Sequence, residues 1–206
     1  MRIDSHHHLW DLAISPRDWL AGEALAGINR TFSMDDFYKE RASTGIDQSI
    51  LVQTIPDYEE MREFFAVAAE HESVIGVVAW IDMSDAGCFQ KLEKYLDIPG
   101  AQKLVGIRDG AQGRADANWL SGDQIVANAR KLAEKDLTFD LLVDPSNLAA
   151  STQLVTRCPD TTFVLDHIGK PNIAKGDQGE LAAWSHSINE LAKNKNVSCK
   201  ISGMVT

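Results

Sequence analysis

Three consecutive histidines near the start of the chain are the first residues that could carry chemistry. They lie in DSHHHLWD, residues 4–11. Side chains two residues apart in a strand share a face, so His6 and His8 would point one way and His7 the other. Two imidazoles whose Cα atoms lie about 7 Å apart can converge on one metal ion or one water. The run is too short for a purification tag and has no Gly/Ser spacer. Strand-end histidines satisfied by backbone groups are the other interpretation.

Two further motifs place a charged or titratable side chain at a strand end. FVLDHIGKP, residues 163–171, puts His167 after an apolar run and before a Gly-Lys-Pro turn that contains Lys170. KLVGIRD, residues 103–109, ends a strand on Arg108, whose forked donors could hold a carboxylate or polarise a carbonyl oxygen. One alternative is a histidine that only caps its strand. The other is a surface ion pair of Arg108 with Asp109 or another acid.

Several other polar or aromatic groups also lie near strand ends and could line a pocket. A structural role is an alternative for each, and Asp140 needs a partner if it is buried, because it interrupts an apolar run. The five positions are Gln53, Trp80, Asp82, Asp140 and Lys200.

The elements that must position these groups alternate along the chain. Short apolar runs predict strands at residues 2–6, 48–54, 74–82, 104–108, 138–143, 162–167 and 197–202. Helical spacing predicts helices at residues 33–43, 57–72, 85–96, 123–135, 146–157 and 180–194. This alternation indicates an α/β domain with a parallel sheet, either an open doubly wound sheet or a (β/α)8 TIM barrel. Neither a GxGxxG turn nor a phosphate-binding loop is present, which disfavours the open nucleotide-binding sheet.

Bulk composition limits the function classes. The chain has 206 residues, 44% of them hydrophobic, and a formal net charge of -10. That charge argues against a nucleic-acid partner, and no apolar run approaches the ~20 residues that a membrane span needs. The three cysteines form no CxxC pair and read as reduced thiols, so we expect a cytoplasmic protein.

Taken together, DSHHHLWD, KLVGIRD, FDLLV, FVLDHIGKP and CKISGMVT resemble the amidohydrolase superfamily. The similar branch is the amidohydrolase-related group of TIM-barrel hydrolases, with sugar-acid lactonases and 2-pyrone-4,6-dicarboxylate lactonase. The resemblance implies that His6, His8 and His167 orient water and the substrate carbonyl, and that they would be the ligands if a metal is bound. It implies that Arg108 stabilises the oxyanion or holds a substrate carboxylate. Gln53, Trp80, Arg108 and Lys170 are the expected substrate-binding residues.

Two departures from the family pattern qualify these expectations. The fifth strand, FDLLV, has no histidine, which argues against a binuclear centre. We expect no metal requirement or one divalent ion, with zinc the ion that imidazole ligands favour. The family also continues into an eighth strand whose aspartate activates the attacking water. This sequence stops at Thr206, so we expect a single barrel domain over residues 1–206, truncated after strand seven.

The expected function is therefore hydrolysis of a small carbohydrate-derived lactone. The expected binding partners are this substrate and, in a possible homo-oligomer, a second copy of the chain. Two alternatives stay open. One is a metal-dependent non-oxidative decarboxylase of the same superfamily, and the other is an inactive fragment or binding module that lacks the strand-eight aspartate.

Overall fold

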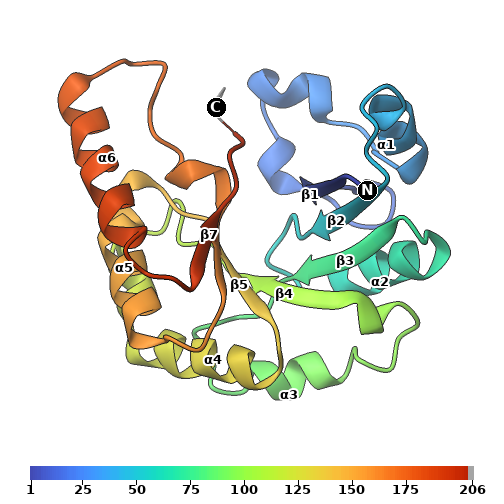
Figure 1. Ribbon diagram of the computed structural model, residues 1–206. Coiled ribbons are helices and arrows are strands. Elements are labelled where there is room, and N and C mark those ends of the chain that lie inside the picture. Colours follow the sequence, from blue (N-terminus) through green and yellow to red (C-terminus); the bar gives the residue numbers. More distant parts are fainter. Residues whose placement is uncertain (204–206) are drawn as a thin grey trace. The chain divides into compact units, whose positions relative to one another are not determined.

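The computed structural model describes residues 1–203, in which strands and helices alternate (Figure 1). The strands are β1 (Ile3–His7), β2 (Gln48–Val52), β3 (Val74–Ala79), β4 (Leu104–Arg108), β5 (Thr138–Leu141), β6 (Phe163–Leu165) and β7 (Val197–Cys199). The helices are α1 (Met34–Arg41), α2 (Glu60–Glu70), α3 (Cys88–Glu93), α4 (Asp123–Glu134), α5 (Leu148–Arg157) and α6 (Gln178–Leu191). The last three letters of the CKISGMVT motif lie outside the described residues.

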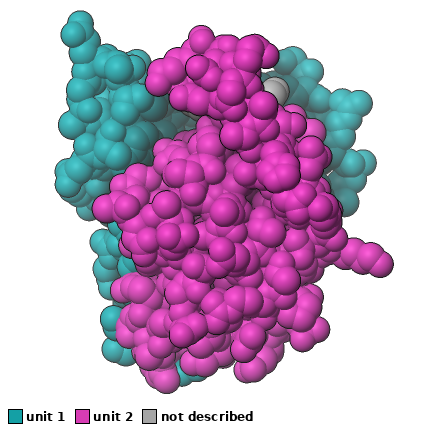
Figure 2. Space-filling view, turned by 90° about the vertical axis from the view of Figure 1, so that its left-hand side faces the viewer, with its two compact units in different colours: residues 1–80, 91–104 teal, residues 81–90, 105–206 magenta. Residues whose placement is uncertain are grey.

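The chain divides into two compact units (Figure 2). The first comprises residues 1–80 and 91–104, and the second comprises residues 81–90 and those from 105 onward. In the first unit β2 pairs in parallel with β1 and with β3. In the second unit β4, β5, β6 and β7 pair in parallel in chain order.

Each unit buries its inner strands, β2 and β3 in the first and β4 to β6 in the second, as apolar runs in parallel strands require. In the first unit Leu51 of β2 and Phe65 of α2 have no exposed surface. In the second unit Phe139 of β5 and Phe163 of β6 are equally buried, and their ring centroids lie 6.0 Å apart. α1 begins where the sequence predicts, because Ser33 and Asp36 form a capping box.

Within residues 1–203, seven parallel strands with helical connections follow the order of a TIM barrel through its seventh strand, so the predicted fold class is confirmed. Among residues 1–203 no helix is both long and apolar enough to cross a membrane.

The predicted strand at residues 162–167 is wrong at its end. β6 stops at Leu165, and Asp166–Gly169 form a short 3-10 turn. The backbone enters the left-handed region at His167 and Ile168, with φ values of 53° and 49°. A strand cannot continue through that conformation, which is a true outlier for a β-branched residue such as Ile168.

Candidate functional site

The end of β1 brings two histidine rings into contact in the first unit. The Nε2 atoms of His6 and His8 lie 3.1 Å apart, and the two ring planes are nearly perpendicular at 89°. The Nδ1 atom of His8 lies 2.8 Å from the carbonyl oxygen of Val52 on β2. A carbonyl oxygen only accepts, so His8 Nδ1 carries the proton, and in the neutral ring Nε2 carries the lone pair. That lone pair faces His6.

His7 takes the opposite direction, as strand alternation predicts. Its ring stacks on Phe37 of α1 with the ring centroids 4.2 Å apart, and only 7% of the residue is exposed. Burial lowers the pKa of His7 to about 4, with smaller contributions from His6 and Arg41. His7 is therefore a neutral core residue at pH 7.

Gln53 and Trp80, two predicted substrate-binding residues, follow β2 and β3 in the same unit. Gln53 is buried, and its backbone N–H donates to the Val78 carbonyl oxygen at 2.8 Å. The Trp80 ring meets the Tyr58 ring edge to face, with 5.1 Å between the ring centroids. Both residues thus sit where the first unit's strands end, beside the β1 histidines in strand order.

The second unit carries a buried network of four charged side chains. Arg108 Nη1 donates to Asp166 Oδ2 at 3.0 Å. Lys200 Nζ donates to Asp140 Oδ2 at 2.6 Å and lies 3.0 Å from Asp166 Oδ1. The four side chains are between 0% and 11% exposed. Two cations thus alternate with two carboxylates, and the network is neutral as a whole.

Strand register explains why these four residues meet. Arg108 of β4 lies opposite Asp140 of β5, and Asp166 and Lys200 come directly after the β6 and β7 residues that pair. Each of four neighbouring strands therefore contributes one charge at the same end of the sheet. Arg108 is buried and pairs with another acid, Asp166, whereas Asp109 pairs with Arg114.

Burial makes this network costly unless every charge keeps a partner. Burial raises the pKa of Asp140, although Lys200 opposes the shift and Asp166 adds to it. Asp140 thus has the partner that its place in an apolar run requires, and that partner is Lys200.

His167 lies on the turn after β6 and is held by the segment that follows β7. Its Nδ1 lies 2.8 Å from Ser202 Oγ. The next residue, Ile168, accepts a hydrogen bond from Trp184 Nε1 at 2.8 Å and donates through its backbone N–H to the Lys200 carbonyl at 3.1 Å. Gly203 packs so closely that a Cβ there would lie 2.9 Å from His167 Cβ. The left-handed turn is therefore braced on both sides.

Lys170 ends the same turn in a left-handed conformation, with φ of 48°. Its backbone N–H donates to the His167 carbonyl at 2.9 Å. The side chain is half-buried, and burial lowers the pKa of Lys170. The backbone of Lys170 thus helps to close the turn, which is the structural role that the sequence left open for it.

Sequence reasoning did not select Asp166, the residue that joins Arg108 to Lys200. The available signal was an acid directly after an apolar strand, in a motif already chosen for its histidine. It also missed a buried cluster in the first unit, formed by Arg17 with Thr54, Glu60 and Glu63. Arg17 lies in a loop without any decodable pattern, so only the fold reveals that cluster.

The site residues therefore form two sets, one in each unit. The first offers imidazole nitrogens that can bind a metal ion or accept a proton from water. The second offers fixed positive charge at Arg108 and Lys200, which can stabilise a negative oxygen or a carboxylate.

Comparison with known proteins adds a family and named relatives. A model of the amidohydrolase family matches residues 3–206. L-fucono-1,5-lactonase from Burkholderia ambifaria is 33% identical over 205 residues, which cover 100% of this chain and 68% of that protein.

Solved structures give the same relationship at the level of the fold. A crystal structure of an amidohydrolase from Burkholderia multivorans with bound zinc matches with a TM-score of 0.89 and 27% identity, over 100% of this chain and 70% of that one. A probable 2-pyrone-4,6-dicarboxylic acid hydrolase from Acinetobacter baumannii matches with a TM-score of 0.72 over 98% of this chain and 70% of that one. Its identity is 16%, which indicates likeness of fold alone.

Proposed function

The chain belongs to the amidohydrolase family, as its motifs predicted, and we propose that it hydrolyses a small sugar-derived lactone. The observation that carries this proposal is the likeness to L-fucono-1,5-lactonase over the whole chain, with strand-end histidines and a buried arginine in place. In the reaction, water adds to the ring carbonyl carbon, the ring C–O bond breaks, and the former ring oxygen takes up a proton. The product is an open hydroxy acid.

The side chains divide the work by charge. His6 and His8 orient the attacking water, directly or through a bound metal ion. Arg108 stabilises the oxyanion that forms on the carbonyl oxygen. Asp166 fixes the guanidinium in place, so Arg108 needs no reorientation during the reaction. Gln53, Trp80 and Lys170 contact the sugar hydroxyls and ring.

A zinc ion is the cofactor that these residues fit. The His8 ring has the arrangement of a metal ligand: its Nδ1–H is directed to a backbone carbonyl, and its Nε2 carries the lone pair that would bind the metal. His6 and His167 are the other imidazole ligands that we propose, and Ser202 Oγ lies 2.8 Å from the Nδ1 atom of His167. When bound, zinc supplies a Lewis acid that polarises the carbonyl and lowers the pKa of bound water.

Location and assembly follow from the same proposal. The three cysteines are free thiols, which persist in the reducing cytoplasm, so we place the protein there. The partner that we propose is a small sugar lactone.

A pH-stat assay with a panel of sugar lactones, including L-fucono-1,5-lactone, tests the function, because ring opening releases one acid equivalent. Zinc content is measured on the same samples by mass spectrometry. We expect the parent protein to release acid faster than the uncatalysed reaction. We expect the His6→Ala and His8→Ala variants to show no release above that background. No release from any lactone would sink the proposal. Tight stoichiometric zinc without lactone hydrolysis would favour a decarboxylase instead.

A further inference from the structure

A fully buried arginine lies in the long loop between β1 and α1, residues 8–33. Arg17 is 4% exposed, and each of its side-chain nitrogens makes a hydrogen bond. Nε donates to Thr54 Oγ1 at 2.7 Å, and Nη1 donates to the Ser15 carbonyl at 2.8 Å. Nη2 donates to Glu60 Oε1 and to Glu63 Oε2, both at 3.2 Å. We call Arg17 with Thr54, Glu60 and Glu63 the Arg17 clamp.

Glu60 is the second buried charge of the clamp. It is 3% exposed, at the first residue of α2. Both of its carboxylate oxygens accept the backbone N–H of Thr54 at 3.0 Å, and Oε1 also accepts the Thr54 hydroxyl. The clamp therefore ties the β1–α1 loop both to the segment that leaves β2 and to the start of α2.

The clamp ends one residue from the proposed substrate site. Thr54 directly follows Gln53. The carbonyl oxygen of Val52, the residue before Gln53, accepts the hydrogen bond from His8 Nδ1. A displacement of Thr54 would therefore move Gln53 and the backbone that orients His8. On the loop side, Trp19 lies two residues from Arg17, is 43% exposed, and meets Trp10 edge to face with ring centroids 5.5 Å apart.

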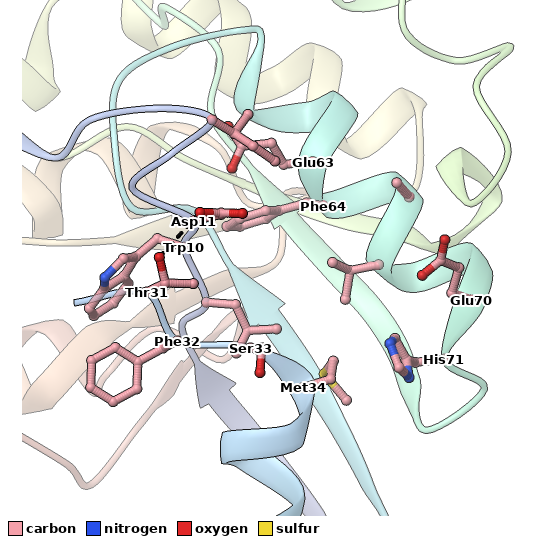
Figure 3. A pocket seen from close by; sticks show the side chains of 14 residues that line it. Trp10, Asp11, Thr31, Phe32, Ser33, Met34, Glu63, Phe64, Glu70 and His71 are labelled. Atoms are coloured by element: carbon pink, nitrogen blue, oxygen red, sulfur yellow. Dashed lines mark hydrogen bonds between the residues drawn. The ribbon is translucent and has the colours of Figure 1, made fainter.

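A cavity lies between the same loop and α2. It has a volume of about 320 Å³ and separates residues 9–14 and 31–34 from α2. Figure 3 shows Glu63 and Phe64 on α2 at one wall and Trp10, Thr31 and Phe32 at the other. Glu63 lines this cavity and also bonds Arg17. The polar clamp therefore links the loop to α2 at the edge of this cavity.

We infer that Arg17 is a positioning residue of the lactone site, which it serves by locking the β1–α1 loop to Thr54 and so setting the place of Gln53. This inference rests on the proposed function. A lysine cannot replace Arg17 fully, because one ammonium group lacks the forked geometry that reaches Thr54, Ser15 and both glutamates together.

The test compares Arg17→Met and Arg17→Lys with Arg62→Met in the full chain. Arg62 is the matched control, because it lies on α2 with its side chain 56% exposed and pairs with the exposed Glu59. Kinetics are measured on the best lactone. We expect Arg17→Met to raise KM about 10- to 100-fold with a smaller change in kcat, Arg17→Lys to recover part of the loss, and Arg62→Met to match the parent.

Hydrogen exchange of residues 8–33 and 53–59 gives a readout that does not need turnover. We expect faster exchange in these two segments in Arg17→Met and parent rates in β4–β7. A parent-like KM, or parent-like exchange in both segments, overturns the inference. If the parent itself hydrolyses no lactone, the proposed function fails, while the exchange data still decide whether Arg17 locks the loop. If Arg17→Met does not fold, Arg17→Lys carries both measurements.

Discussion

His8 donates through Nδ1 to the carbonyl oxygen of Val52 at 2.8 Å, so the backbone of β2 fixes both the tautomer and the direction of a histidine from β1. A ring held in this way presents Nε2 rather than Nδ1 to the site. The same contact couples the orientation of His8 to the end of β2, after which Gln53 and Thr54 follow in the chain.

Replacement of His8 by asparagine removes the Nε2 lone pair that faces His6. We expect His8→Asn to lower lactone turnover at least about 100-fold and to weaken zinc binding about 10- to 100-fold. Titration calorimetry with zinc and the pH-stat assay measure the two effects. The control is His186→Asn, an exposed histidine on α6. A His8 variant with parent activity and parent zinc affinity would remove this residue from the site.

Arg108 should be sensitive even to a conservative change. Lysine keeps the charge but cannot hold Asp166 and still present a second planar donor. We expect Arg108→Lys to lower kcat about 100-fold, with a smaller effect on KM, because the oxyanion exists only along the reaction path. Arg157→Lys, at an exposed pair with Asp123, is the control. An effect confined to KM would instead assign Arg108 to holding a substrate carboxylate.

Lys200 is expected to control stability. Lys200→Met leaves the buried carboxylates of Asp140 and Asp166 with one cation between them, which should lower the free energy of unfolding by about 3–5 kcal/mol. Urea denaturation measures this change. Adding Asp140→Asn to the variant should recover part of the loss. Asp123→Asn, at the side chain that is 95% exposed, should change the free energy by less than about 1 kcal/mol. Equal effects from both single variants would contradict the buried network.

Glu60 predicts a pH dependence of stability in the opposite sense to an ordinary carboxylate. Burial raises its pKa from 4.5 to about 7, although Thr54 and Arg17 oppose the shift. The folded protein then binds more protons than the unfolded chain between these two values, so the stability from Glu60 is full below pH 4.5 and falls as pH rises to about 7.

Glu60→Gln removes that titration. We expect the free energy of unfolding of the variant to depend less steeply on pH between 4.5 and 7 than that of the parent, with urea unfolding at several pH values as the measurement. Glu59→Gln, whose side chain is 62% exposed, is the control. Identical slopes for the parent and Glu60→Gln would show that the carboxyl ionises at its ordinary pKa.

The sequence could predict much of the fold because local patterns encode it. The strand at residues 104–108 is found with the bounds that the apolar run suggests, and α4 begins at Asp123 as expected. The two-residue period placed His6 and His8 on one face and His7 on the other. These features depend on neighbours in the chain, which is the information that one sequence carries directly.

The parts that sequence reasoning missed depend on distant partners or on unusual backbone. The Arg108–Asp166 pair joins residues 58 positions apart, and Lys200 lies 60 positions from Asp140. Nothing in the apolar pattern states which strand-end charges will meet. The left-handed turn at His167 and Ile168 also has no local signal, because side chains of these types seldom adopt it and bracing from beyond β7 makes it possible.

The four-charge network has a consequence for how this sequence can evolve. Arg108, Asp140, Asp166 and Lys200 come from four consecutive strands, and the loss of any one leaves a charge stranded in the interior. A single substitution that removes one of these charges is therefore expected to lower the stability of the fold. A pair of substitutions that keeps the sum of the charges is expected to lower it less. Among relatives, the residues at these four positions should change together or not at all. The rest of the sequence should vary more freely than these four positions.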